Sequence, residues 1–286
     1  MASTRAVKAL AAAVLALLAA LLLAGCTWTG KGRDVAQALE KTAAYKTRAF
    51  SGSVGFKVAG DDSKSFSMTF AGASDNSDPA NPMFTMTMVA EGQSSGVSMP
   101  GDGNMYLVTP QGTYGVPVPQ AQRGSSALDS AAIYRALGKA IGHFAESQPM
   151  QNAQGKSVTT IAARVSRNKL CSAVLPAFGK AMSKMSAAGG GGSPLAGFSG
   201  GGSLEQVCKL MLAGDPQVWF GIDNGALTDV SLNANIALFG AGAMAVALQY
   251  HEYNQGQPQP AIKKPAGAQM LQSLTELQQL GAAGSR

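Results

Sequence analysis

The chain has 286 residues, of which 46% are hydrophobic and 13% are charged. A chain of this length and composition can bury a core of ordinary size, which argues against disorder and fits one large domain. The formal charge is +6, but the basic residues form no run and do not alternate with aromatic residues, which argues against nucleic-acid binding.

The N-terminus has the order of an export signal. Arg5 and Lys8 precede an uncharged run at 9–24 that contains only Ala, Val and Leu. This run is shorter than the roughly 20 apolar residues that cross a bilayer, and charge, apolar run and small residues follow one another as in a cleaved signal peptide. The sequence therefore predicts a signal peptide at 1–25, whose removal takes away two positive charges and lowers the net charge from +6 to +4.

A cysteine follows the predicted cleavage site. The motif Leu-Ala-Gly-Cys at 23–26 matches the lipobox of bacterial lipoproteins, in which the thiol of the cysteine, here Cys26, takes a diacylglyceryl group. The alternative is an ordinary signal peptide with a chance cysteine, but the cysteine falls at the required place after the apolar run. Because two or more acyl chains give lasting attachment, we expect Cys26 and a short tether at 26–33 to anchor the chain on the extracytoplasmic face of the cell membrane.

Two further cysteines, Cys171 and Cys208, remain as a pair in an oxidising compartment. A disulfide is the natural interpretation, with two free buried thiols as the alternative. Metal binding would need more ligands, and His143 and His251 stand in no ligand-spaced array. The sequence predicts neither a metal nor a cofactor.

The first predicted elements are a helix and a run of strands. Apolar residues recur at helical spacing over 34–45, and Asp34 is a plausible N-cap. Apolar residues then alternate with polar ones at 50–58, 66–70 and 84–88, followed by strands at 105–109 and 113–118. Such alternation predicts antiparallel strands with one apolar and one polar face.

The middle of the chain mixes helices with one strand. Ile133, Leu137, Ile141 and Phe144 form an apolar stripe that predicts a helix at 127–147. A strand is predicted at 158–165, followed by a helix capped by Asn168 and a partner helix from Ser203. Between these two helices, a Gly- and Ser-rich stretch at 187–203 predicts a flexible insertion.

The C-terminal part has the clearest strand pattern. Alternating runs at 218–222 and 228–238 flank Asn224-Gly225, which is typical of a hairpin turn. A further strand is predicted around 246–250, and an amphipathic helix with Met270, Leu274 and Leu277 after Pro265. The predicted fold class is α+β, with a single domain at 34–286 built on a large antiparallel sheet.

The order of these elements resembles that of LppX/LprG-type actinobacterial lipoproteins and of the wider LolA/LolB-like superfamily. Two stretches add to the resemblance: VWFGIDNGALTDVSLNANI at 218–236 and YHEYNQGQPQPAIKKPAG at 250–267. The resemblance covers most of the mature chain. It implies a curved sheet, or half-barrel, with helices on its concave side and a hydrophobic cavity that takes acyl chains. The Gly-rich insertion, the Cys171–Cys208 pair and the many methionines depart from that pattern, which leaves the ligand unidentified.

Large apolar residues on the predicted strands and on the helix at 127–147 are the candidates for lining such a cavity. Flexible methionines suit a surface that adapts to varied apolar ligands, although Met at such spacing also fills ordinary cores. The candidate residues are Phe56, Phe66, Met68, Phe70, Phe84, Met86, Met88, Ile133, Leu137, Val230 and Leu232.

Enzymatic function has weaker support. Residues 197–201 fit the pattern G-x-S-x-G around Ser199, but this motif needs a preceding strand and a following helix, and here it lies in the Gly- and Ser-rich stretch. We therefore predict no catalytic residue. Two non-catalytic functions stay open: a carrier of lipid or another hydrophobic ligand, or a module that holds or senses an envelope protein partner through the helical hairpin and its insertion.

Overall fold

The computed structural model describes residues 31–58, 61–78, 80–118, 141–144, 148–152, 155–174, 208–209, 212–238, 242–272 and 276. The signal peptide, Cys26, Ile133, Leu137, Ser199 and the insertion at 187–203 lie outside the described residues. The proposals that concern them stay predictions.

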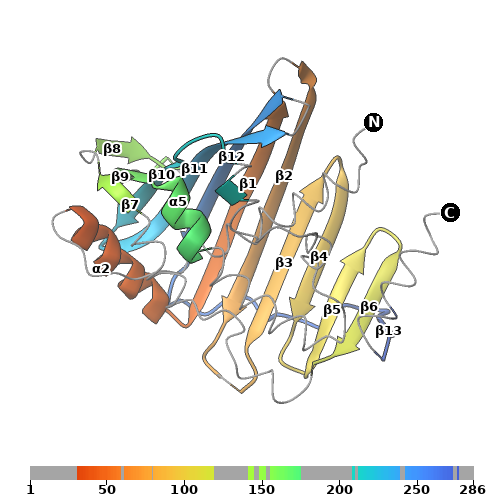
Figure 1. Cartoon of the computed structure of the whole chain (residues 1–286). Coiled ribbons are helices and arrows are strands. Elements are labelled where there is room, and N and C mark those ends of the chain that lie inside the picture. Colours follow the sequence, from red (N-terminus) through yellow and green to blue (C-terminus); the bar gives the residue numbers. More distant parts are fainter. Residues whose placement is uncertain are drawn as a thin grey trace.

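One large sheet dominates the described residues (Figure 1). It contains thirteen strands in the order β13-β6-β5-β4-β3-β2-β1-β12-β11-β10-β9-β7, and β8 also pairs with β9. All neighbouring strands are antiparallel except β13 and β6. The strands are β1 (Thr47–Val58), β2 (Asp61–Asp75), β3 (Met83–Ala90), β4 (Gln93–Met99), β5 (Asn104–Thr109), β6 (Gly112–Pro117), β7 (Ile141–Phe144), β8 (Gln148–Gln151), β9 (Ser157–Val165), β10 (Gln217–Asp223), β11 (Ala226–Leu238), β12 (Gly242–Tyr253) and β13 (Gln269–Met270).

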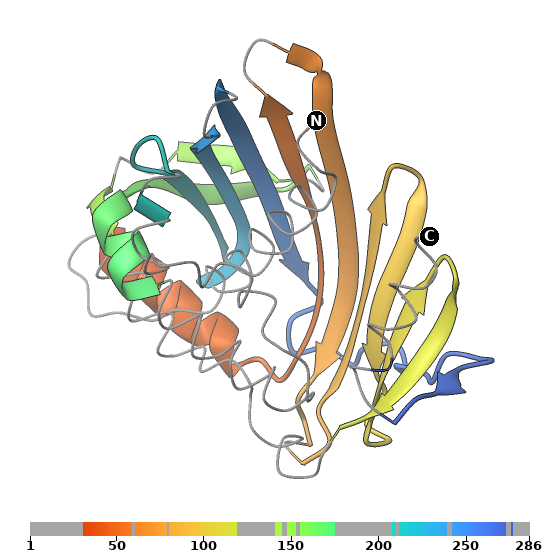
Figure 2. The ribbon, with the colours of Figure 1, turned by 45° about the vertical axis from the view of Figure 1, so that its right-hand side comes forward.

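The predicted first helix is present as α2 (Lys31–Ala44). Its stripe of Val35, Ala38 and Leu39 is at most 1% exposed and belongs to the main core. The helix contacts β10 and β11, and Figure 2 shows it lying across the β9–β12 end of a curved sheet. Asp34 is not the N-cap, because the helix begins at Lys31 and Asp34 lies in its first turn. There the carboxylate still lies near the positive end of the helix dipole.

Hydrogen bonds fix the C-terminal end of α2 to the β10–β11 hairpin. The Thr42 hydroxyl donates to the carbonyl of Ala38 and accepts from the backbone N–H of Leu227, with a distance of 2.8 Å for each bond. The hairpin turn itself has Asn224 at φ 50° and Gly225 at φ 72°. These are the positive φ values of a type I′ turn, so the hairpin predicted from Asn-Gly is confirmed.

The helix predicted at 127–147 is wrong at its C-terminal end. Ile141–Phe144 is strand β7, in which Ile141 pairs with Val165 and Phe144 with Ala163 of β9. Two apolar residues three positions apart fit a helical stripe, but β9 would otherwise have an open edge, and pairing with β7 satisfies its backbone hydrogen bonds. Tertiary context decides this segment.

The second helical segment is less regular than an α-helix over its described part. Ser166 is the N-cap of α5 (Arg167–Lys169), so Asn168 lies inside the helix instead of capping it, and a π-helix η1 (Leu170–Val174) follows. Cys171 in η1 is bonded to Cys208, with the two Cα atoms 5.6 Å apart. The predicted disulfide is therefore present in the structure. Arg167 supports the same region, since its guanidinium donates to the carbonyl of Leu212 over 3.0 Å.

The predicted C-terminal amphipathic helix is wrong at Met270, and its other two apolar residues, Leu274 and Leu277, lie outside the described residues. Met270 lies in β13, which pairs in parallel with Tyr114 and Gly115 of the edge strand β6. The missing side chain of Gly115 leaves room for the Met270 sulfur. Because β13 occupies part of the β6 edge, backbone pairing there outweighs the helical periodicity of the sequence.

Before it reaches β13, the chain crosses β4 and β5. The Ser98 hydroxyl donates to the carbonyl of Lys263, and the Lys264 ammonium lies 5.5 Å from the centre of the Tyr106 ring. Tyr106 is fully buried and donates its hydroxyl to Asp102. Burial and this bond raise the pKa of Tyr106. Desolvation acts to raise the pKa of Asp102, but hydrogen bonds from Tyr106 and Asn104 outweigh it and lower that pKa.

Candidate functional site

The pairing register of the sheet places the described candidate residues on one face. In β1 the even-numbered residues Phe50, Val54 and Phe56 point to the core, and side chains directly opposite on neighbouring strands share a face. We call this side of the sheet the apolar face. The odd-numbered residues of β1 define the opposite, polar face.

The apolar face can be followed as rows that cross the strands. One row runs from Leu232 through Leu248, Val54 and Met68 to Ala90. The next row toward the N-terminal end of β1 contains Val230, Tyr250, Gly52, Phe70 and Met88. The row after that contains Glu252, Phe50, Gly72, Met86 and Val97.

Two further pairs complete the set of candidates. Phe56 lies opposite Phe66, and Phe84 lies opposite Ser74. All nine described candidates, taken from strands far apart in the sequence, therefore share one surface: Phe56, Phe66, Met68, Phe70, Phe84, Met86, Met88, Val230 and Leu232.

Burial divides this face into two parts. Val230, Leu232, Phe56 and Met68 are between 0% and 8% exposed and belong to the main core, to which the stripe of α2 also belongs. In contrast, Phe66, Phe70, Phe84, Met86 and Met88 on β2 and β3 are only partly buried, although they pack against the same core. The first part is a closed core, and the second part offers accessible apolar surface.

Aromatic rings form a continuous cluster where the two parts meet. The Phe50 ring stacks on Phe84 at 5.9 Å and on Tyr250 at 6.1 Å, measured between ring centres, and Phe70 lies 6.3 Å from Tyr250. Two glycines make space for these rings. A Cβ atom on Gly52 would collide with the Phe70 ring, and one on Gly72 would collide with the Phe50 ring.

A polar cluster ends the apolar face near the start of β1. Glu252, which is 3% exposed, accepts the Tyr250 hydroxyl at 2.7 Å and pairs with Arg48 at 3.4 Å. Its other oxygen accepts the side-chain amide of Gln255 at 2.9 Å. This carboxylate is therefore hydrogen-bonded at both oxygens, as a buried charge must be.

Sequence reasoning missed several residues of this site. Phe50, Gly52 and Tyr250 were placed on strands by their alternation, but they were not among the cavity candidates. Phe50 and Gly52 lie an even number of positions before the candidate Phe56 on the same strand, and Tyr250 continues the alternation of Val246 and Leu248. This shared period of two is a signal that was present in the sequence. The Arg48–Glu252 pair joins residues 204 positions apart, and no local pattern reveals it.

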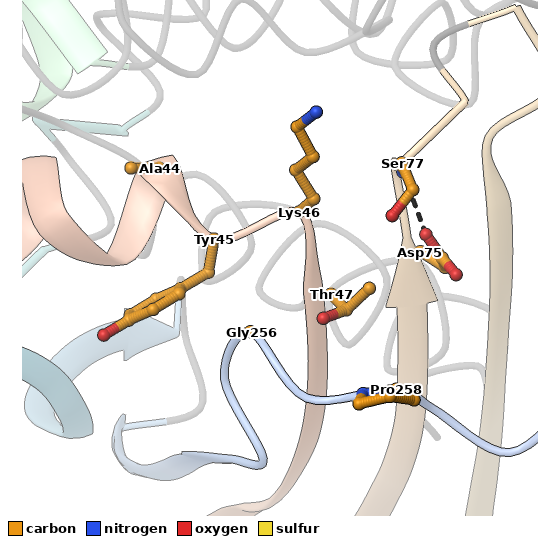
Figure 3. Close-up of a pocket in the computed structure, with 8 residues that line it drawn as sticks. All are labelled: Ala44, Tyr45, Lys46, Thr47, Asp75, Ser77, Gly256 and Pro258. Carbon is orange, nitrogen blue, oxygen red and sulfur yellow. Dashed lines mark hydrogen bonds between the residues drawn. The ribbon is translucent and has the colours of Figure 1, made fainter.

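One pocket among the described residues lies where α2 joins β1 (Figure 3). It has a volume of about 530 Å³, and its lining consists of Ala44, Tyr45, Lys46, Thr47, Asp75, Ser77, Gly256 and Pro258. The Asp75 carboxylate accepts the backbone N–H of Ser77 at 2.9 Å. No candidate cavity residue lines this pocket, so the accessible apolar surface and the pocket are distinct features.

The polar face carries a buried histidine. His251 is 7% exposed, its Nδ1 lies 2.7 Å from Asp229, and its ring stacks on Tyr253 at 5.7 Å. Its Nε2 atom has no hydrogen-bond partner. His251 is thus a buried structural residue of the sheet. The side chain of the other histidine, His143, lies outside the described residues.

Two other features are absent from the residues that the structure describes. The described part of the chain contains no group of three or more His, Cys, Asp or Glu residues placed to hold a metal ion. Within the described ranges, no helix combines the length and apolar content needed to cross a membrane.

Comparisons with known protein families and with curated proteins find no match to this sequence. Among solved structures, a LolA superfamily protein from Nitrosomonas europaea is similar over 81% of this chain and 96% of its own, with a TM-score of 0.28 and 8% identity. A DUF1329 family protein from Desulfovibrio piger is similar over 78% of this chain and 90% of its own, with a TM-score of 0.22 and 9% identity. The function of this chain is therefore inferred from its own residues.

Proposed function

We propose that this chain is a cell-envelope lipoprotein of the LppX/LprG type that binds the acyl chain of a lipid, or another hydrophobic ligand, on the apolar face of its sheet. The observation that carries the proposal is the partly exposed apolar surface of β2 and β3. Phe66, Phe70, Phe84, Met86 and Met88 lie side by side there and are not fully buried. Contiguous apolar surface of this kind is typical of a ligand or partner site.

The position of α2 supports a half-barrel arrangement with helices on the concave side. Because α2 packs on the apolar face mainly at β11 and also at β10, it covers that side of the face. The Met and Phe side chains of β2 and β3 then provide a deformable wall for acyl chains, since thioethers adapt their shape to what they contact.

The lipobox supports placement at a membrane. A lipid on Cys26 and a tether of a few residues before α2 would hold the apolar face close to the bilayer. A carrier in this position could exchange lipids with the membrane without diffusing far from it.

Replacing Cys26 with serine tests the anchor, because serine lacks the thiol that is lipidated. We expect the wild-type chain in the membrane fraction of its producing cells and the Cys26→Ser chain in the soluble envelope fraction, as measured by fractionation and immunoblotting. Mass spectrometry of the wild-type chain should also show the mass of the acyl groups. Wild-type protein without this added mass would overturn lipid anchoring but would leave ligand binding open.

Replacing Met88 with aspartate tests the ligand surface. A carboxylate on the apolar face would have to be desolvated beside the ligand, so we expect lipid occupancy of the purified full chain to fall at least about tenfold. Native mass spectrometry after detergent removal measures the occupancy. The matched control is Thr87→Asp, which places the same charge one residue away on the exposed polar face.

Both variants should keep the far-ultraviolet circular dichroism of the wild type, which separates a loss of binding from a loss of fold. If the wild-type chain carries no lipid under any condition, or if Thr87→Asp and Met88→Asp reduce occupancy equally, the proposed site is wrong.

A further inference from the structure

One end of the apolar face carries an exposed lysine, Lys46, and this charge bears on the kind of ligand bound. The inference rests on the proposed function, because it concerns the orientation and chemistry of a ligand on that same face.

The end near the start of β1 is cationic and polar. Arg48 lies on the apolar face, two residues before Phe50 on the same strand, and pairs with Glu252. Lys46 precedes it by two further residues, is exposed and lines the pocket at this end. The described ion pairs are Arg48–Glu252, Lys156–Asp223 and His251–Asp229. Lys46 takes part in none of these pairs, so its charge is available to a ligand.

Asp75 does not neutralise Lys46, although both line the pocket. Asp75 pairs with Thr47 in the sheet, which places it on the polar face, and its carboxylate accepts the Ser77 backbone N–H. Figure 3 shows the ammonium of Lys46 directed away from the Asp75 carboxylate. A negative group at the end of the apolar face would therefore meet Lys46 without first displacing an acidic side chain.

The opposite end of the apolar face carries a pair of aromatic rings. Phe56 and Phe66 lie with their ring centres 5.9 Å apart, and Met244 and Ile236 beside them are 6% and 7% exposed. The strand from Arg48 to Phe56 spans roughly 26 Å at about 3.3 Å per residue. That length accommodates a complete fatty-acyl chain between the cationic end and the aromatic end.

We propose that the ligand is an acyl chain that carries an anionic head, and that it binds with the head at Lys46 and the chain directed along the accessible side chains of β2 and β3 toward Phe66. A carboxylate and a phosphate are both suitable heads, so a free fatty acid and an anionic phospholipid share the required chemistry. Lys46 acts as a specificity residue, since its charge favours an anionic head over a neutral one with the same chain.

Parinaric acid and its methyl ester provide the test, because they share one fluorescent chain and differ only in the negative charge of the head. The full chain, kept soluble in an amphipathic polymer, is titrated with each probe. We expect the acid to bind wild type about fivefold more tightly than the ester. This factor is the gain in affinity that one partly exposed ion pair gives. In Lys46→Gln this preference should disappear through weaker binding of the acid alone.

Lys57→Gln is the matched control, since it removes the same charge from the same strand at an exposed position of the polar face. It should retain the full preference for the acid. Competition with vesicles of phosphatidylglycerol and of phosphatidylcholine then separates the two sources of the head: stronger displacement by phosphatidylglycerol identifies a phospholipid, and equal weak displacement identifies a fatty acid.

Equal binding of acid and ester to wild type, or an equal effect of Lys46→Gln and Lys57→Gln, would overturn this inference while leaving hydrophobic ligand binding intact. Absence of binding for both probes would instead overturn the proposed function itself.

Discussion

Replacing both Cys171 and Cys208 with alanine should lower the free energy of unfolding by about 4 kcal/mol. The bond closes a loop of 37 residues, and a cross-link of this span restricts the unfolded chain by about 3–4 kcal/mol in the chain-entropy model. Cys171 is also fully buried in the main core, so its replacement by a smaller side chain adds a small packing loss.

Urea unfolding of the full chain, followed by circular dichroism with and without a thiol reductant, measures this effect. Reductant should destabilise the wild type to nearly the level of the double variant, whereas the variant should be unaffected by it. Equal stability of both proteins in the absence of reductant would show that the bond contributes nothing to the fold.

Replacing Gly52 with valine should have the second large effect. The Cβ atom of any larger residue would collide with the Phe70 ring and with the backbone carbonyl of Gln249, and the backbone cannot move without disturbing the pairing of β1 with β12. We expect a loss of about 3 kcal/mol in unfolding free energy, the upper range for overpacking a sheet core. Because Phe70 would be displaced, lipid occupancy of the folded variant should also fall.

Gly55→Val is the matched control on the same strand. Gly55 faces the polar side, and a Cβ atom added there would have no neighbouring atom within 4 Å, so valine should be neutral or slightly stabilising through its preference for strands. Thermal unfolding of both variants distinguishes them. Equal midpoints for Gly52→Val and Gly55→Val would contradict the close fit between Gly52 and Phe70.

The polar cluster around Glu252 explains why the apolar face ends where it does. Glu252 is held by Tyr250, Arg48 and Gln255, and Gln255 also donates to the carbonyl of Leu227 over 2.7 Å. Leu227 in turn bonds to Thr42 of α2. A chain of hydrogen bonds thus joins the helix, the hairpin and β12 at one end of the site, which fixes the position of Arg48 beside the aromatic cluster.

Sequence patterns were sufficient for most strands because alternation is a local property. The period of two over 50–58 and 228–238 reflects one buried and one exposed face, whatever the partner strand is. The same local reasoning identified the Asn224-Gly225 turn and the apolar stripe of α2. It missed β4, where Gln93–Met99 has the sequence QSSGVSM, because this strand has too few apolar residues for its alternation to stand out.

Local patterns failed where two structures compete for the same residues. Ile141 and Phe144 fit a helix, but they pair with β9. Met270 also fits the start of a helix, but it pairs with the edge strand β6. The gain from completing a hydrogen-bonded edge depends on a strand that lies elsewhere in the chain, so the sequence of the segment alone does not contain it.

The sequence by itself determined the alternating strands, the hairpin, the disulfide pair and nine described residues that share one apolar face. Only the tertiary structure decided which part of that face is closed and which is accessible, since exposure depends on where α2 packs. It also decided that Arg48 meets Glu252 and that Phe70 lies over Gly52. The Arg48–Glu252 contact joins β1 to β12, which are neighbours in the sheet but far apart in the chain. Burial and charge at the site follow from this order of the strands.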